Sequence, residues 1–79
     1  MSPTVFRYKN YRFFFFSREE SRMHIHVINP AGEAKFWIKP EIEVAKSVGF
    51  VEHELNDLAD IINERIDEIE KSWRNHFGS

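Results

Sequence analysis

The sequence has no residues that form disulfides and few of the residues that interrupt helices and strands. Its 79 residues include no cysteine, three glycines and three prolines. Without cysteine, neither a disulfide framework nor a thiolate zinc site can stabilise the fold. A chain of this length lies near the lower limit for a self-sufficient hydrophobic core. We therefore expect a single domain over residues 1–79 that depends on its own apolar packing.

Long hydrophobic stretches and several catalytic signatures are missing as well. No apolar run approaches the roughly 20 residues that span a bilayer, and the sequence contains no charged segment followed by the apolar segment of a secretory signal. A glycine-rich phosphate loop, a nucleophile elbow and catalytic carboxylates paired at a recognisable spacing are also absent from the sequence. We expect a soluble cytoplasmic protein without a membrane partner and without a cofactor.

Charge is divided unevenly along the chain. Residues 1–40 carry seven Lys and Arg against three Glu, a net charge of +4, whereas residues 41–79 carry four basic against ten acidic side chains, a net charge of −6. Such asymmetry often separates a surface for an anionic partner from a solvated one. The simplest interpretation of the acidic second half is a solvated helix surface.

The first half of the sequence has the pattern of a small sheet. Residues rich in Val, Ile, Tyr and Phe, bounded by turn residues, predict four strands. The expected strands are Thr4–Lys9, Tyr11–Ser17, Met23–Asn29 and Ala34–Lys39. Residues 41–48 fit a short fifth strand, and a helical turn fits them nearly as well.

From about Val51 the hydrophobic period changes to that of a helix. Apolar residues recur every three or four positions, which predicts one long amphipathic helix. The recurring residues are Leu55, Leu58, Ile62, Ile66, Ile69, Trp73 and Phe77. The predicted fold is therefore α+β, an antiparallel sheet of four or five strands with one long C-terminal helix packed on one face.

Alternation along the strands predicts which side chains the helix covers. One face is apolar: Phe13, Phe15, Met23, Ile25, Val27, Ala34, Phe36 and Ile38. The other face is basic and aromatic: Arg12, Phe14, Phe16, His24, His26, Lys35, Trp37 and Lys39. Because one helix can cover one side only, we expect the second face to be exposed in a monomer.

The second face carries two histidines two residues apart. The roots of His24 and His26 lie roughly 7 Å apart on a strand and on the same side, so both rings can serve one phosphate, metal or proton transfer. They are the candidate catalytic residues, one taking a proton from a nucleophilic hydroxyl such as the 2′-hydroxyl of RNA while the other donates to the leaving oxygen. Surface histidines without a role are an equal alternative. No third ligand is indicated by spacing, so no metal ligands are assigned, and whether the histidine pair binds a metal stays open.

Basic and aromatic side chains surround the two histidines. Arg12, Arg22, Lys35 and Lys39 are candidates for neutralising the phosphates of a nucleic acid. The rings of Phe14, Phe16 and Trp37 form a candidate partner interface. A homodimer, a different protein partner and base stacking on nucleic acid all remain open explanations for such a patch.

Several segments together resemble a known family. They are Pro3-Thr4-Val5, the run Tyr11-Arg12-Phe13-Phe14-Phe15-Phe16-Ser17, His24-x-His26-Val27, Gly32-Glu33-Ala34-Lys35 and Asp67-Glu68-Ile69-x-x-x-Trp73. In this order and over nearly the whole chain, they resemble domain of unknown function family 4160. Arg22-Met23 stands before the first histidine where many relatives have Pro-Pro.

The resemblance implies a small prokaryotic protein, often encoded beside another small uncharacterised protein. It further implies a toxin–antitoxin-like module in which a chain like this one is the candidate toxin. The family's two-histidine motif maps onto His24 and His26. We expect the chain to bind or cleave RNA through this face, and the alternative is a non-enzymatic homodimeric or partner-binding module. Whether it is an enzyme stays open.

Overall fold

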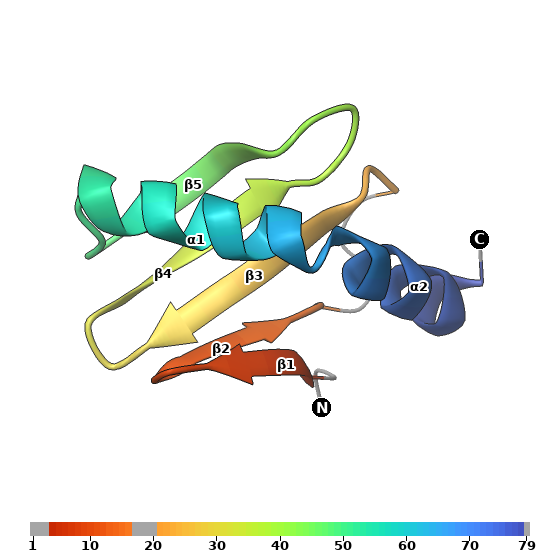
Figure 1. The fold of residues 1–79 in the computed structure, drawn as a ribbon, viewed down its shortest axis with the longest axis horizontal. Helices are drawn as coiled ribbons and strands as arrows, with labels where there is room; N and C mark the ends of the chain where they lie inside the picture. The colour runs from red at the N-terminus through yellow and green to blue at the C-terminus, as the bar shows by residue number, and fades with distance from the viewer. Residues whose placement is uncertain (1–3, 17–20, 79) are drawn as a thin grey trace.

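The protein is an antiparallel sheet with two helices packed against one side (Figure 1). The computed structural model describes residues 4–16 and 21–78. The strands are β1 (Thr4–Tyr8), β2 (Tyr11–Phe14), β3 (His24–Asn29), β4 (Gly32–Trp37) and β5 (Glu43–Val48). They pair in the order β1-β2-β3-β4-β5, and each pairs with its neighbour in an antiparallel manner. The predicted α+β class is confirmed, and residues 43–48 form a strand.

Short polar turns fix the register of this sheet. Lys9 has a positive φ of 54° in the tight turn between β1 and β2. Between β3 and β4, the Asn29 side-chain oxygen accepts hydrogen bonds from the amides of Ala31 and Gly32, at 2.8 and 3.1 Å. Such an Asx turn replaces backbone pairing at the end of a strand. Gly32 is required there because an added Cβ would collide with the carbonyl oxygen of Val48. The predicted end of the second strand at Ser17 and the connection that follows it lie outside the described residues.

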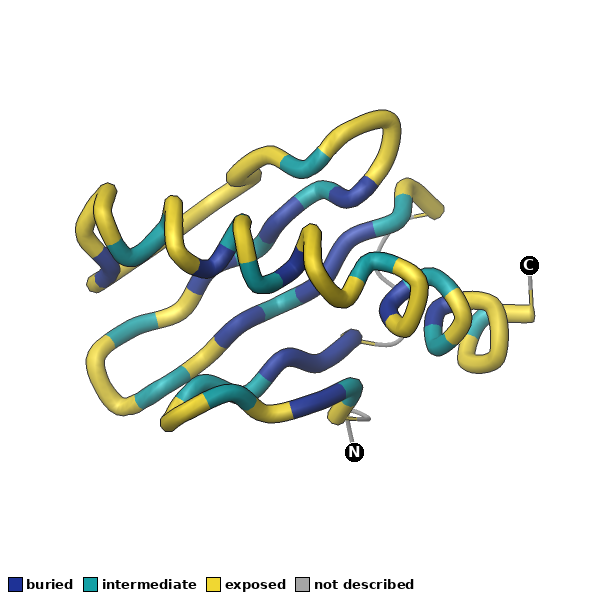
Figure 2. Tube along the Cα trace, viewed as in Figure 1, coloured by how far each residue is buried: buried dark blue, intermediate teal, exposed yellow. Residues whose placement is uncertain are grey.

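The core lies between the sheet and the helices, as the burial colouring in Figure 2 shows. It contains the residues predicted for the apolar face, with Met23 packed partly buried against it. The buried members are Phe6, Phe13, Phe15, Ile25, Val27, Ala34, Phe36, Ile38, Phe50, Leu58, Ile62, Ile69 and Trp73. The predicted apolar face is therefore confirmed.

The C-terminal part is two helices, so the prediction of one long helix is wrong. Helix α1 (Glu52–Glu64) and helix α2 (Ile66–Phe77) meet at Arg65, where φ is −110° and ψ is 23°. The Arg65 amide is shared between the carbonyls of Ile61 and Ile62, both at 3.1 Å, and its guanidinium lies 4.5 Å from the centre of the Phe6 ring. Residues 51–77 contain neither Pro nor Gly, so tertiary packing sets the bend, and the periodicity could not reveal it. Neither helix in the described part of the chain has the length and hydrophobicity to cross a bilayer.

Two side chains predicted to be exposed are buried. His24 has an exposed fraction of 0% and Phe14 of 6%. The His24 ring is enclosed at the start of β3 because Trp73 reaches it from α2, with ring centres 5.2 Å apart. The Phe14 ring is covered by the Arg12 guanidinium, 4.6 Å from its centre. The sheet face away from the helices is therefore partly covered by its own side chains.

Candidate functional site

The face of the sheet away from the helices is called the open face here. Its residues include Arg12, Phe14, Phe16, His26, Ile28, Glu33, Lys35, Trp37, Lys46 and Val48. Strand register aligns four of them across the sheet, since Phe14 lies opposite His26, His26 opposite Lys35, and Lys35 opposite Lys46. These four residues are the central row. The row runs from aromatic to cationic in one direction across β2, β3, β4 and β5.

A pocket of about 270 Å³ lies over the central row. Its aromatic end is formed by Phe16, which is 43% exposed and whose ring centre is 4.4 Å from that of His26. The rings of Phe14 and His26 stack nearly parallel, at 25° and 5.5 Å. Its cationic end is formed by Lys35 and Lys46. An apolar surface beside convergent charges is the usual composition of a ligand site.

The two lysines of the central row face each other directly. Cross-strand neighbours have Cβ atoms about 5 Å apart, and like charges at that separation destabilise a sheet. Lys35 and Lys46 occupy such a position, and His26 is the next residue in the row. An anion bound between them would relieve this repulsion. Lys35 and Lys46 therefore bring two positive charges together at one end of the pocket.

Only one of the two candidate histidines lines the pocket. His26 does so, whereas the His24 ring is buried between Trp73 and Trp37, with ring centres at 5.2 and 5.9 Å. The Nδ1–H of His24 donates to the carbonyl of Arg22 at 2.7 Å. The two imidazole centres are 5.4 Å apart. His24 thus lies beside His26 without lining the pocket, and the expectation of two exposed imidazoles is wrong for His24.

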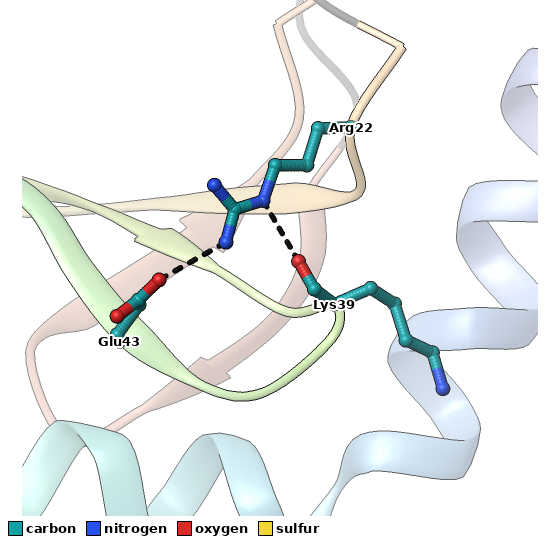
Figure 3. A network of polar contacts seen from close by, with 3 residues as sticks. All are labelled: Arg22, Lys39 and Glu43. Atoms are coloured by element: carbon teal, nitrogen blue, oxygen red, sulfur yellow. Dashed lines mark hydrogen bonds and ion pairs between the residues drawn. The ribbon is translucent and has the colours of Figure 1, made fainter.

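Arg22 and Lys39 are not among the residues that line the pocket, and Figure 3 shows the contacts that they make instead. Arg22 donates from Nε to the carbonyl of Lys39 at 2.8 Å and pairs with a Glu43 carboxylate oxygen at 3.0 Å. Its guanidinium lies 4.3 Å from the centre of the Trp37 ring. The Lys39 side chain extends to the helix side, where Nζ lies 2.7 Å from a Glu70 oxygen. Their predicted phosphate contacts stay predictions, and the geometry gives both residues structural contacts.

The remaining predicted residues lie on the open face. Arg12 donates from Nε to the Thr4 hydroxyl at 2.7 Å while covering Phe14. Lys35 lies with Nζ 4.5 Å from the centre of the Trp37 ring, on the border of the pocket. Trp37 is half-buried beneath two cations, so of the three aromatic residues predicted for a partner interface, Phe16 offers the most exposed ring.

Sequence reasoning missed four residues of the pocket: Ile28, Glu33, Lys46 and Val48. Alternation along the strands from His26 and Lys35 assigns Ile28 and Glu33 to this face, so the sequence pattern could have predicted both residues. Lys46 and Val48 could not be placed because the register shifts opposite Lys35 and Phe36, whose partners are Lys46 and Val44. Ala45 is the extra residue of this bulge, and a bulge interrupts two-residue alternation.

Within residues 4–16 and 21–78, no group of three or more His, Asp and Glu is placed to hold a metal ion.

Fold and site define a small α+β protein whose open sheet face combines cations with aromatic rings. The chain belongs to the family described as Domain of unknown function (DUF4160), whose model matches residues 10–74. The resemblance inferred from the sequence motifs is thereby confirmed. No curated protein and no solved structure matches the chain.

Proposed function

We propose that this protein binds single-stranded RNA on its open face, as the toxin of a two-gene toxin–antitoxin-like module. The observation that supports this most directly is the central row, in which His26, Lys35 and Lys46 follow one another across three strands. Phosphate oxygens are the anions that such cations hold in RNA complexes.

Aromatic exposure beside the cations favours RNA over a simple anion. The Phe16 ring is 43% exposed and borders the same pocket as Lys35 and Lys46. Unpaired bases stack on such rings while the backbone follows the positive charges. The net charge of −2 opposes nonspecific binding along long nucleic acids, because that affinity comes mainly from phosphate neutralisation. We therefore propose a short site that holds one or two nucleotides.

The geometry supports binding more than cleavage by two histidines. His26 lines the pocket and can contact a phosphate or a 2′-hydroxyl, whereas His24 is enclosed by aromatic rings. In the proposed complex His26 contacts the ligand and His24 holds its ring in place. A partner protein encoded beside this chain would mask the same face.

Fluorescence anisotropy with a labelled hexauridylate tests the proposal. We expect the double variant Lys35→Ala/Lys46→Ala to bind more weakly and to lower the slope of log Kd against log salt by about 0.7 per phosphate contact removed. Lys71→Ala, an exposed lysine on α2, is the matched control and should bind like the wild type. Equal binding by the double variant and the control would contradict the proposal, as would no binding at low salt.

Expression in cells tests whether the chain is the toxin of a two-gene module. The chain alone should arrest growth, the neighbouring gene should relieve the arrest, and the double lysine variant should be harmless while keeping its fold. Harmless expression of the wild-type chain would contradict the assignment as a toxin without affecting the binding result.

The second candidate function is a non-enzymatic interaction module, homodimeric or bound to a protein partner. Exposed apolar residues favour it, since Phe16, Ile28 and Val48 are 43%, 37% and 59% exposed and border one pocket. Such patches often mark protein interfaces. In that case Phe16→Asp should change the oligomeric state measured by light scattering, and Lys35→Ala/Lys46→Ala should leave it unchanged.

A further inference from the structure

Glu33 is an unexpected residue in a pocket that attracts anions. Among the described residues that line the pocket, it is the only acidic one. It lies two residues from Lys35 on β4, about 7 Å along the strand, and on the same face. A carboxylate at this distance repels a phosphate held by the central row. Glu33 therefore fits a different part of the ligand.

The surroundings of Glu33 suit the flat face of a base. Register places Ile28 on one side of it and Val48 on the other, and both are exposed. Within the described part of the chain, the structure shows no hydrogen bond or ion pair between Glu33 and another residue. A base lying on these two aliphatic side chains would present its edge to the carboxylate. The phosphate of the same nucleotide would then reach the central row, which is the neighbouring row of side chains on the open face.

A carboxylate accepts hydrogen bonds and donates none, so it selects ligand groups that donate. Guanine carries two adjacent donors on its Watson–Crick edge, N1–H and the N2 amino group, which match two carboxylate oxygens. Cytosine and adenine offer one amino group beside a ring acceptor, and uracil offers one N–H between two carbonyls. Paired donors on one edge also give the geometric specificity of a bidentate contact.

We infer that Glu33 makes the open face selective for guanine in single-stranded RNA. The inference rests on the proposed RNA-binding function and adds to it the identity of the base. The phosphate lies between Lys35 and Lys46, a neighbouring base stacks on Phe16, and the guanine edge donates to Glu33.

Labelled hexamers test this selectivity directly. The probes are hexauridylate and the same hexamer with one central uridine replaced by guanosine or by inosine, which lacks the N2 amino group. A bidentate base contact predicts about ten-fold tighter binding of the guanosine hexamer than of hexauridylate, with the inosine hexamer between them. Glu33→Gln should remove most of this preference, because a carboxamide presents one acceptor and one donor. Glu41→Gln changes the same charge on an exposed residue outside the pocket and should keep the preference.

Each result separates the inference from the function on which it rests. If all three hexamers bind equally and binding needs Lys35 and Lys46, the guanine inference is wrong and RNA binding stands. If no hexamer binds, both are wrong. The guanosine-to-inosine comparison uses only wild-type protein, so a poorly folded variant would not obscure the result.

Discussion

Lys35 and Phe36 are neighbours on β4, yet they belong to two very different surfaces. Phe36 has an exposed fraction of 0% and packs in the core beneath the helices, whereas Lys35 borders the pocket on the open face. Strands β2, β3 and β4 alternate between the two faces in this manner, although Phe14 and His24 are themselves buried. The helix-covered face stabilises the fold, and the open face carries the apolar and cationic side chains that line the pocket.

The open face is not simply the uncovered half of the sheet. Several of its side chains cover one another, since Arg12 lies over Phe14 and both Arg22 and Lys35 lie over Trp37. Cation–π contacts of this kind contribute about 0.5–1 kcal/mol each at exposed sites. What remains exposed after this packing is concentrated around Phe16 and β5. The exposed apolar side chains Phe16, Ile28 and Val48 of the open face therefore all lie at the one pocket.

The largest difference between the faces should appear in unfolding by urea. Phe36→Ala removes a fully buried ring, and large-to-small core changes of this type lower the free energy of unfolding by about 3–5 kcal/mol. Phe16→Ala removes a 43% exposed ring from the open face and should lower it by less than about 1 kcal/mol. Similar losses for both would show that the open face is covered in solution.

Substituting the two histidines should change two different properties, the stability of the fold at His24 and the binding of RNA at His26. His24→Ala empties a buried site against Trp73 and should lower the free energy of unfolding by about 2–3 kcal/mol. His26→Ala should change unfolding little and weaken hexauridylate binding, because His26 lines the pocket. A stability loss at His26 that matches the loss at His24 would contradict this division.

Most of the fold follows from the sequence because burial repeats with the period of each element. Alternation in Phe13, Ile25 and Phe36 predicted the buried face, and the three- and four-residue spacing predicted the helical stripe. The bend at Arg65 did not follow, since both helices continue one stripe without a breaking residue. A bend set by contact with Phe6 depends on residues distant in the sequence.

The site was only partly predictable for a related reason. Strand alternation placed His26 and Lys35 correctly on the open face, but it could not show that Trp73 would reach around the sheet end and enclose His24. Lys46 escaped prediction because the bulge at Ala45 shifts the register. Strand alternation predicts which way the side chains of one strand point. Burial at a sheet end or an edge depends instead on neighbouring side chains that the fold brings there.

A polar contact on the helix-covered side gives a pH-dependent prediction. The Tyr11 hydroxyl donates to a Glu54 carboxylate oxygen at 2.9 Å and links β2 to α1. Burial, followed by the contact with Glu54, raises the pKa of Tyr11 above its usual value of 10.0. The folded state then holds the Tyr11 proton more tightly than the unfolded state. The stabilisation that this contact provides is therefore complete below pH 10.0 and is lost as the pH rises above that value.

Tyr11→Phe should lower the free energy of unfolding at neutral pH by about 1 kcal/mol. Above pH 10.0 the variant should lose less stability than the wild type, as measured by urea titration at several pH values. An identical alkaline loss in both proteins would contradict the role of Tyr11.

The smallest expected effect is a gain in the free energy of unfolding. Because the other substitutions lower this free energy, a gain is specific to the open face. Replacing Lys46 with Glu exchanges a like-charged cross-strand pair with Lys35 for an attractive one, so Lys46→Glu should raise the free energy of unfolding by about 0.2–1 kcal/mol at low salt. The gain should shrink at high salt, where exposed charges are screened. Inorganic phosphate should stabilise the wild type by mass action and leave Lys46→Glu unaffected, since the variant lacks the paired cations. Lys71→Glu, on exposed α2, makes the same charge change away from the sheet and serves as the control. A destabilised Lys46→Glu variant that still responds to phosphate would show that Lys35 and Lys46 do not repel each other, and the anion-binding role of the central row would be wrong.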